Sequence, residues 1–369
     1  MSVEFIGLIS SKQRNEVRPV AGTADYRIDR DYLIRFARAH EEGGFDAVLL
    51  GYGSTGDDPF ATAAVAAANT DSLRYLIAHR PGFVGPTLEA RKVTTLDHLT
   101  GGRIVLNIIT GGNNAEQRRD GDFLEKDDRY ARTDEFLDVL KLAWTSPKPF
   151  DYNGRYYHVE GAYSDDKPLQ QPYPPLSVSG ASDAAVHVGA RHADVYMMWG
   201  EPLADVAQRI RGIRAAAAAY GRSPRISVSF RPILGPTESA AWDRAHEILE
   251  GVLAERARRG LGEPARPENV GSQRLLAAAA AGDVADRRLY TAIARANGAQ
   301  GNSTALVGTP EQVAEALLEY YDLGVDTILI RGFDPLEDAI AYGRDLIPLV
   351  RGEVARREAA RNRTEPVPA

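Results

Sequence analysis

The sequence predicts an α/β protein, and more specifically a (β/α)8 barrel, on three observations. The chain has 369 residues, of which 44% are hydrophobic, and this is enough for a large core. About eight short apolar segments alternate with helical segments, which is typical of a parallel sheet covered by helices. Residues 6–14, after the first apolar segment, read IGLISSKQR and lack the GxGxxG loop of dinucleotide-binding sheets. The barrel is therefore favoured over an open, doubly wound sheet.

The expected strands are short runs of apolar and branched residues. They cover residues 2–10, 45–50, 73–78, 104–109, 176–178, 195–198, 226–230 and 327–330. The segments between them carry apolar residues at helical spacing or begin with acidic residues or proline. These helices cover residues 31–42, 61–69, 86–99, 134–144, 183–191, 202–220, 239–258, 309–321 and 336–350. The alternation leads us to expect a single domain over residues 1–350.

Residues 260–302 interrupt this alternation with prolines, glycines and an alanine run. We expect them to form an insertion that acts as a mobile lid, and not a separate domain. Residues 351–369 are polar, and we expect a C-terminal tail that frays or reaches a neighbouring subunit.

The composition excludes several classes of function. A net charge of −7 argues against nucleic acid as a partner, because phosphate binding needs a basic surface. The chain has no cysteine, which excludes disulfides and a thiolate nucleophile. The N-terminus, MSVEFIGLIS, lacks the basic and apolar regions of a signal peptide, and no segment has the length of a membrane span. We therefore expect a cytoplasmic protein that does not enter the membrane.

Two polar loops follow predicted strands directly. Residues 110–113 (TGGN) follow the strand at 104–109, and residues 179–183 (SGASD) follow the strand at 176–178. In parallel α/β proteins, ligands bind at the carboxyl ends of strands. The second loop also begins a helix, where free backbone N–H groups and the Ser182 hydroxyl suit a phosphate. Ordinary capping of the helix by Ser182 or Asp183 is the alternative.

Cationic side chains also gather at predicted strand ends. Several cations at one rim of a barrel would bind a carboxylate, sulfonate or phosphate, whereas each alone could pair with a nearby acid. The set comprises Lys12, His79, Arg80, Arg231 and Arg331, with Arg295 in the insertion. Trp199 ends another strand, where it either borders a ring-binding cleft or fills the barrel mouth.

No spacing of metal ligands stands out, and neither HExxH nor GxSxG occurs. Acid–base or redox chemistry without a metal or a nucleophile indicates that an organic cofactor carries the reaction.

Six segments, in order along the chain, resemble the bacterial luciferase-like flavin monooxygenases, and specifically their alkanesulfonate monooxygenase branch. They are ARKVTTLDHLTGGRIVLNIITGG (90–112), DGDFLEKDDRYARTDEF (120–136), FDYNGRYYHVEGA (150–162), LQQPYPPLSVSGASDAA (169–185), ADVYMMWGEP (193–202) and STALVGTPEQVAEAL (303–317).

The resemblance implies a TIM barrel that uses O2 and reduced FMN supplied by a separate NAD(P)H-dependent flavin reductase. It implies a desulfonation reaction of sulfur metabolism, in which the C–S bond of an organosulfonate breaks to give an aldehyde and sulfite. It also implies a homodimer or tetramer. The residues that match flavin-binding positions of the family, with the glycine between two of them, are Thr110, Tyr130, Ser179, Gly180 and Ser182.

The chain departs from the family on the substrate side. Lys12 and Arg231 stand at histidine positions, Gly56 at a cysteine position, and Phe333 at a tyrosine position. We therefore expect a polar or sugar-derived organosulfonate as the substrate. The expected catalytic residues are Arg231, Trp199, His79 and Arg331. The expected substrate-binding residues are Lys12, Tyr52, Arg231, Arg295 and Arg331.

Three alternatives remain open. The same cofactor could oxidise a non-sulfonate anion or a sulfone. A deazaflavin-dependent oxidoreductase could use the same fold without O2. A flavin-storage protein is the non-enzymatic alternative.

Overall fold

A computed structural model of the chain describes residues 3–13, 27–301 and 303–364. Eight parallel strands form its centre, and they close into a barrel because β9 pairs with β8 on one side and with β13 on the other. The strands are β1 (Glu4–Ile9), β2 (Ala47–Leu50), β3 (Arg74–His79), β4 (Ile104–Ile108), β7 (Leu176–Ser179), β8 (Val195–Trp199), β9 (Arg225–Leu234) and β13 (Thr327–Ile330). Each corresponds to a strand expected from sequence, and the (β/α)8 barrel is confirmed.

Alternate residues of these strands face opposite sides, as the strand geometry requires. Ile6, Leu76 and Val105 belong to a cluster inside the barrel. Their neighbours Phe5 and Tyr75 face outward and pack in the main core against the helices. The position of a side chain relative to the barrel interior therefore changes from one residue to the next.

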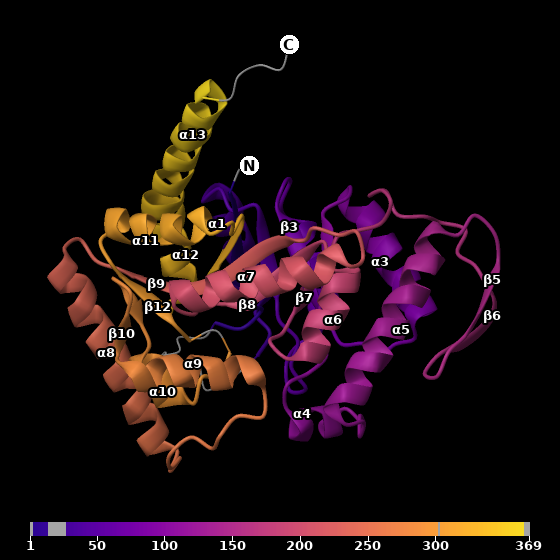
Figure 1. Ribbon diagram of the computed structural model, residues 1–369, viewed down its shortest axis with the longest axis horizontal. Helices are drawn as coiled ribbons and strands as arrows, with labels where there is room; N and C mark the ends of the chain where they lie inside the picture. The colour runs from indigo at the N-terminus through magenta and orange to yellow at the C-terminus, as the bar shows by residue number, and fades with distance from the viewer. Residues whose placement is uncertain (1–2, 14–26, 302, 365–369) are drawn as a thin grey trace.

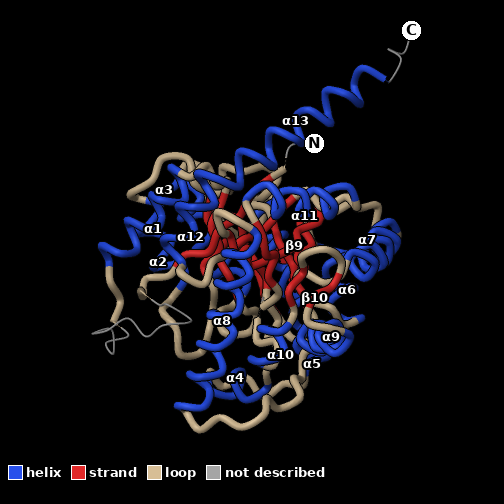
Figure 2. Tube along the Cα trace, turned by 90° about the vertical axis from the view of Figure 1, so that its left-hand side faces the viewer, coloured by secondary structure: helices blue, strands red, loops and turns tan. Residues whose placement is uncertain are grey.

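Helices cover the outside of the barrel, and Figure 2 shows the strands enclosed by them. They are α1 (Arg30–Glu42), α2 (Pro59–Ala67), α3 (Pro86–Thr100), α5 (Lys126–Thr145), α6 (Asp183–His192), α7 (Leu203–Ala218), α8 (Glu238–Arg258) and α11 (Pro310–Asp322). Helix α5 begins eight residues before the expected start at residue 134. Its first turn carries Asp127 and Asp128, which stabilise a helix N-terminus.

Between β4 and β7 the structure has a helix and a hairpin that were not expected from sequence. A short helix, α4 (Asn114–Arg119), follows β4. An antiparallel hairpin of β5 (Phe150–Asn153) and β6 (His158–Ala162) follows α5 and lies at the right edge of the molecule in Figure 1.

The insertion at residues 260–302 contains α9 (Val270–Ala281), β10 (Val284–Ala285), β11 (Leu289–Tyr290) and α10 (Ala292–Asn297). Strand β12 (Ala305–Gly308) follows and pairs in parallel with the last residues of β9, from Arg231 to Leu234. Helix α10 packs against both α8 and α9 (Figure 1). The predicted mobility of this lid stays a prediction.

The C-terminal region differs from the expected polar tail. Helix α12 (Pro335–Ala341) leads through a π-helical turn (Tyr342–Leu346) into α13 (Ile347–Thr364), which projects from the body in Figures 1 and 2. Glu353 pairs with Arg356 at 2.8 Å and with Arg357 at 3.0 Å. Such pairs one turn apart stabilise a solvent-exposed helix. The polar residues from 351 to 364 therefore continue the helix. Residues 365–369 lie outside the described residues. No helix in the described part of the chain is long and apolar enough to cross a membrane.

Candidate active site

A cavity of about 1050 Å³ opens at the carboxyl ends of the barrel strands. Every barrel strand contributes a lining residue at or near its end, as in other barrels of this type. One residue from each strand, in barrel order, is Leu8, Leu49, Ala78, Asn107, Ser179, Met198, Ser229 and Leu329. Residues 264–272 of the insertion line the same cavity, so the predicted lid borders the site.

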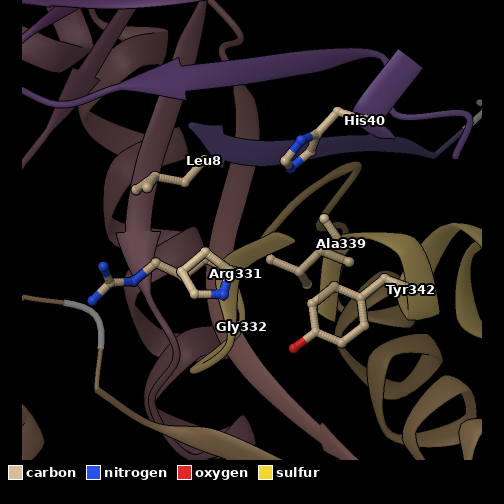
Figure 3. Close-up of a pocket in the computed structure, with 8 residues that line it drawn as sticks. Leu8, His40, Arg331, Gly332, Ala339 and Tyr342 are labelled. Carbon is tan, nitrogen blue, oxygen red and sulfur yellow. The ribbon is translucent and has the colours of Figure 1, made fainter. Parts of the chain in front are cut away.

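A second, much smaller cavity of about 20 Å³ lies between β13 and α12 (Figure 3). Leu8, His40, Arg331 and Tyr342 are among its lining residues. It is large enough only for about one water molecule. The Arg331 guanidinium points away from His40 and Tyr342 in Figure 3, and Arg331 also lines the large cavity. We therefore place the candidate site in the large cavity.

One end of the large cavity carries hydroxyl groups and a helix start. Thr110, Tyr130, Ser179, Gly180 and Ser182 all line it. Ser182 caps α6, and its hydroxyl accepts a hydrogen bond from the Ala185 N–H. Burial raises the pKa of the Tyr130 hydroxyl. The hydrogen bonds between this hydroxyl and the side chains of Ser182 and Thr110 act in the opposite direction, but the pKa stays above its usual value. Tyr130 is therefore a neutral hydrogen-bond donor at physiological pH.

The loop backbone at this end requires glycine. Gly180 has a φ of +152°, and a Cβ placed on it would lie 2.4 Å from the Cβ of Ala185. Its carbonyl oxygen accepts hydrogen bonds from Arg209 at 2.7 Å and from Tyr196 at 3.1 Å. The bare backbone lets a ligand approach, while the two side chains hold the loop through its carbonyl oxygen.

This end of the cavity has the donors to hold a phosphate, and the lining also has polar and apolar surface that could hold a ring. Backbone N–H groups at the start of α6, together with the hydroxyls of Tyr130 and Ser182, are suitable phosphate donors. Deeper inside, Asn107 is 5% exposed, and its side-chain oxygen has no partner among the described residues. An unpartnered buried acceptor favours a ligand with a polar N–H edge. Met197 and Ile109 supply apolar surface nearby in the lining.

An ion-pair network joins this loop to the insertion. Glu201 is 1% exposed and lies directly after β8. It accepts hydrogen bonds from Arg209 of α7 at 2.8 Å and from Arg274 of α9 at 2.6 Å. Trp199, two residues earlier, lines the cavity and packs against a cluster formed by Leu275, Ala294 and Ala299 of the insertion. The end of β8 therefore connects the barrel with the loop after β7 (residues 179–182) and with the insertion.

The cavity lining also includes Tyr52, Arg80 and Arg331. Arg80 is 5% exposed and pairs through Nη2 with Glu116 at 2.8 Å. Its guanidinium carbon lies 4.7 Å from the centre of the Tyr52 ring. The Nε and Nη1 atoms of Arg80 have no hydrogen-bond partner within the described residues. A buried guanidinium with donors to spare favours an anionic ligand.

His79, expected to be catalytic, does not line the cavity. It lies on β3 between Ala78 and Arg80, which do line it, so the strand alternation turns the His79 ring outward. The ring stacks on Phe136 with centroids 5.1 Å apart, and its Nδ1 lies 3.2 Å from Glu89. Burial lowers the pKa of His79 to about 3, so it is neutral and part of the packing between barrel and helices.

Arg231 and Arg295 also lie outside the cavity lining. Arg231 is 2% exposed, stacks 3.6 Å above the Phe333 ring and donates to the Gly332 carbonyl oxygen at 2.8 Å. The Arg295 side chain is 54% exposed and pairs with Asp283 at 2.5 Å. Lys12 is half-buried, does not line the cavity, and lies just before residues 14–26, which are not described. Of the expected substrate-binding residues, the structure brings Tyr52 and Arg331 together in the cavity.

Sequence reasoning missed several lining residues. Asn107 carried a usable signal, because it is the polar residue within the apolar run IVLNII. Arg80 was among the cations at predicted strand ends, but it was not predicted to be a catalytic or substrate-binding residue. Glu116 and Arg209 carried no local signal, because each gains its role from a partner far away in sequence. The cationic residues at the mouth that were also missed are Arg119, Lys126 and Arg266.

Comparisons with known proteins show the family and the fold of the chain. Residues 4–327 match the family model described as luciferase-like monooxygenase. Among solved structures, a riboflavin lyase with modified FMN and its substrate riboflavin is 22% identical, with a TM-score of 0.78 over 96% of this chain and 92% of that one. The EDTA monooxygenase EmoA from Chelativorans sp. BNC1 is 21% identical, with a TM-score of 0.77 over 96% and 94% of the two chains. DmoA from Hyphomicrobium sulfonivorans is 23% identical, with a TM-score of 0.75 over 95% and 88%.

These identities establish a shared fold, and the family match covers most of the chain. The resemblance inferred from sequence is thereby confirmed at the level of the family. The chain belongs to the luciferase-like monooxygenases, a family of flavin-dependent enzymes.

Proposed function

We propose that this protein is the oxygenase of a two-component FMN-dependent monooxygenase that cleaves the C–S bond of an organosulfonate. A separate NAD(P)H-dependent reductase supplies the reduced FMN, and O2 is the co-substrate. The observation that carries the proposal is the make-up of one cavity. Its lining holds both the loop after β7, whose helix start and hydroxyl groups suit a phosphate, and the incompletely partnered Arg80.

Reduced FMN, when bound, supplies the electrons that activate O2. Tyr130, Ser179 and Ser182 would hold its phosphate end, with Gly180 giving the close backbone approach, and Thr110 would lie near its ring. Asn107 would accept a hydrogen bond from the ring. Trp199 and residues 264–272 of the insertion would exclude water from the cavity, which favours oxygen transfer over loss of the oxidising power to solvent.

The substrate side of the cavity suits a small polar anion. Arg80 and Arg331 offer guanidinium groups, and sulfonate oxygens match guanidinium donors well. Tyr52 donates its hydroxyl to Asp120 at 3.3 Å, and Ser229 adds a second hydroxyl to the lining. These groups could bind hydroxyls of a hydroxylated or sugar-derived sulfonate.

The reaction balances with one molecule of O2 and the two electrons and two protons that reduced FMN supplies. One oxygen atom is inserted at the carbon that carries the sulfonate, and the other becomes water. The C–S bond then breaks with its electron pair on sulfur, which leaves as sulfite, while the carbon becomes an aldehyde. The role of the protein is to hold the anion and the flavin in one dry cavity.

The test is an anaerobic titration of the protein with reduced FMN, followed by O2 and a panel of substrates. The panel pairs linear, hydroxylated and sugar-derived sulfonates with carboxylates of the same carbon skeleton and with a sulfone. Sulfite release that depends on the protein and continues with catalase present supports the proposal. If the protein binds reduced FMN but oxidises only a carboxylate or a sulfone, then its substrate is not a sulfonate. Failure to bind reduced FMN, with binding of a reduced deazaflavin, favours the deazaflavin alternative.

A further inference from the structure

The lining of the large cavity is cationic, although the chain as a whole has a net charge of −7. Among the described residues, two carboxylate side chains line the cavity, those of Glu116 and Glu268. Six cations line it, and they are Arg80, Arg119, Lys126, Arg209, Arg266 and Arg331. An excess of one sign of charge in a cleft focuses the electric field there, so the cavity attracts anions into an otherwise acidic protein.

Three of these cations are free to meet a ligand. Arg119 is the last residue of α4, Lys126 is the first residue of α5, and Arg266 lies in the insertion. None of them makes a hydrogen bond or an ion pair with another described residue. Arg119 and Arg266 are exposed and Lys126 is half-buried. A residue that lines a cavity and is also exposed lies at its opening, so these charges stand at the mouth.

The elements that carry the three cations are joined at one residue, Asn114. Its backbone N–H, at the start of α4, donates to the Glu268 carboxylate of the insertion at 3.0 Å. Its side-chain oxygen accepts a hydrogen bond from Arg129 of α5 at 2.9 Å. Helix α4, the insertion and the beginning of α5 therefore meet at this mouth.

Lys126 connects the mouth with the end of the cavity that has phosphate donors. It lies one helical turn before Tyr130, so both side chains share a face of α5, and both line the cavity. A cation in the first turn of a helix opposes the helix dipole. Lys126 therefore costs α5 some stability, and a bound anion beside it would offset that cost.

We propose that Arg119, Lys126 and Arg266 capture the phosphate of reduced FMN at the mouth, before it moves to the loop at residues 179–182. This inference rests on the cofactor of the proposed function. A phosphate monoester carries about −1.5 to −2 charges at neutral pH. A focused field of opposite sign raises the association rate of such a ligand by about ten- to a thousandfold. Fast capture matters to a two-component enzyme, because free reduced flavin reacts with O2 in solution.

The test compares the association rates of reduced FMN and reduced riboflavin, which lacks the phosphate. Both are mixed anaerobically with the full chain in a stopped-flow fluorimeter. Raising the salt from about 20 to about 500 mM shortens the screening length from about 20 Å to about 4 Å. We expect association of reduced FMN to slow by about tenfold or more over this range, and association of reduced riboflavin by less than about twofold.

A triple variant with Arg119→Gln, Lys126→Gln and Arg266→Gln assigns the effect to the mouth. At low salt we expect it to bind reduced FMN about tenfold more slowly than the wild type and to lose most of the salt dependence. Its dissociation rate should change by less than about threefold, because steering acts on the encounter and not on the bound state.

A second triple variant removes the same charge from exposed positions outside the cavity lining, and it carries Arg118→Gln, Arg211→Gln and Arg259→Gln. We expect it to bind reduced FMN within about twofold of the wild-type rate. The proposal is overturned if the wild-type rate for FMN does not depend on salt, or if both triple variants slow it equally. The wild-type comparison of the two flavins needs no variant, so it decides even where a variant does not fold.

Failure of the capture site and failure of the proposed cofactor give different results. If the capture site alone is wrong, reduced FMN binds at a rate that salt does not change. If the cofactor is wrong, reduced FMN does not bind at any salt concentration, and the inference is overturned together with the proposed function.

Discussion

Arg209 donates a hydrogen bond to the carbonyl oxygen of Gly180 at 2.7 Å, which ties helix α7 to the loop after β7. The same guanidinium pairs with buried Glu201 at 2.8 Å. Arg209 therefore holds the loop that we assign to the flavin phosphate, and it also lines the cavity itself. Glu201 keeps Arg274 as a second partner, so loss of Arg209 does not leave it without a cation.

The first prediction follows from that contact. Arg209→Gln should weaken binding of reduced FMN by about tenfold, because a hydrogen bond to a charged donor contributes about 1.5–3 kcal/mol and only part of it is transmitted through the loop. Anaerobic fluorescence titration measures the dissociation constant. Arg211→Gln, on the exposed face of the same helix, is the matched control. Equal affinities in the two variants would show that Arg209 does not position the loop.

Arg80 should determine affinity for the anionic substrate. Arg80→Gln removes the buried charge, and we expect KM for an anionic substrate to rise by about ten- to a hundredfold. The dissociation constant for reduced FMN should change little. Arg91→Gln, an exposed arginine on α3, serves as the control. If the substitution weakens flavin binding as strongly as it raises KM, then Arg80 supports the whole cavity and does not select the anion.

The stability of the protein should depend on pH through His40. Burial lowers the pKa of His40 from 6.5 to about 4. Between these values the unfolded chain binds more protons than the folded chain, so the free energy of unfolding falls as the pH is lowered through that range. From pH 7 to pH 5 this amounts to about 2 kcal/mol for one histidine.

Urea unfolding at pH 7 and pH 5 measures this difference. His40→Gln should remove about 2 kcal/mol of the pH-dependent part, whatever its effect on absolute stability. An unchanged pH dependence in the variant would mean that other groups carry it.

Gly7 should tolerate no side chain. A Cβ placed on Gly7 would lie 2.1 Å from a ring carbon of His40, and His40 is itself held by a contact of 2.8 Å to the Phe36 carbonyl oxygen. We expect Gly7→Ala to lower the free energy of unfolding by about 1–3 kcal/mol. Gly212→Ala is the control, because a Cβ there meets open space and should stabilise α7 by up to about 1 kcal/mol. Thermal or urea unfolding compares them, and equal stability of Gly7→Ala and wild type would contradict the packing argument.

The elements that we located from sequence are those whose pattern of residues lies within the element itself. Each of the eight barrel strands is an apolar run, and an apolar run between breakers predicts a buried strand wherever it occurs. The loops at Thr110 and Ser179 were found because glycine and hydroxyl residues end such runs. The β5–β6 hairpin and the extension of α13 to Thr364 were missed, because an exposed element leaves no strong apolar pattern.

The candidate site was less predictable, because the roles of cations depend on distant partners. His79 and Arg80 are neighbours in sequence, yet one packs against Phe136 and the other lines the cavity. Arg231 and Arg295 carry the same side chain as Arg80, but they lie outside the cavity lining. Arg231 stacks on Phe333, and Arg295 pairs with Asp283.

The sequence by itself determined the family, the barrel and the polar loops at its strand ends, because these follow from local patterns of apolar residues and glycine. Only the tertiary structure decided which charged side chains face the cavity. That choice depends on the two-residue alternation of closed strands and on pairing between residues far apart in the chain. Both are set when the barrel closes.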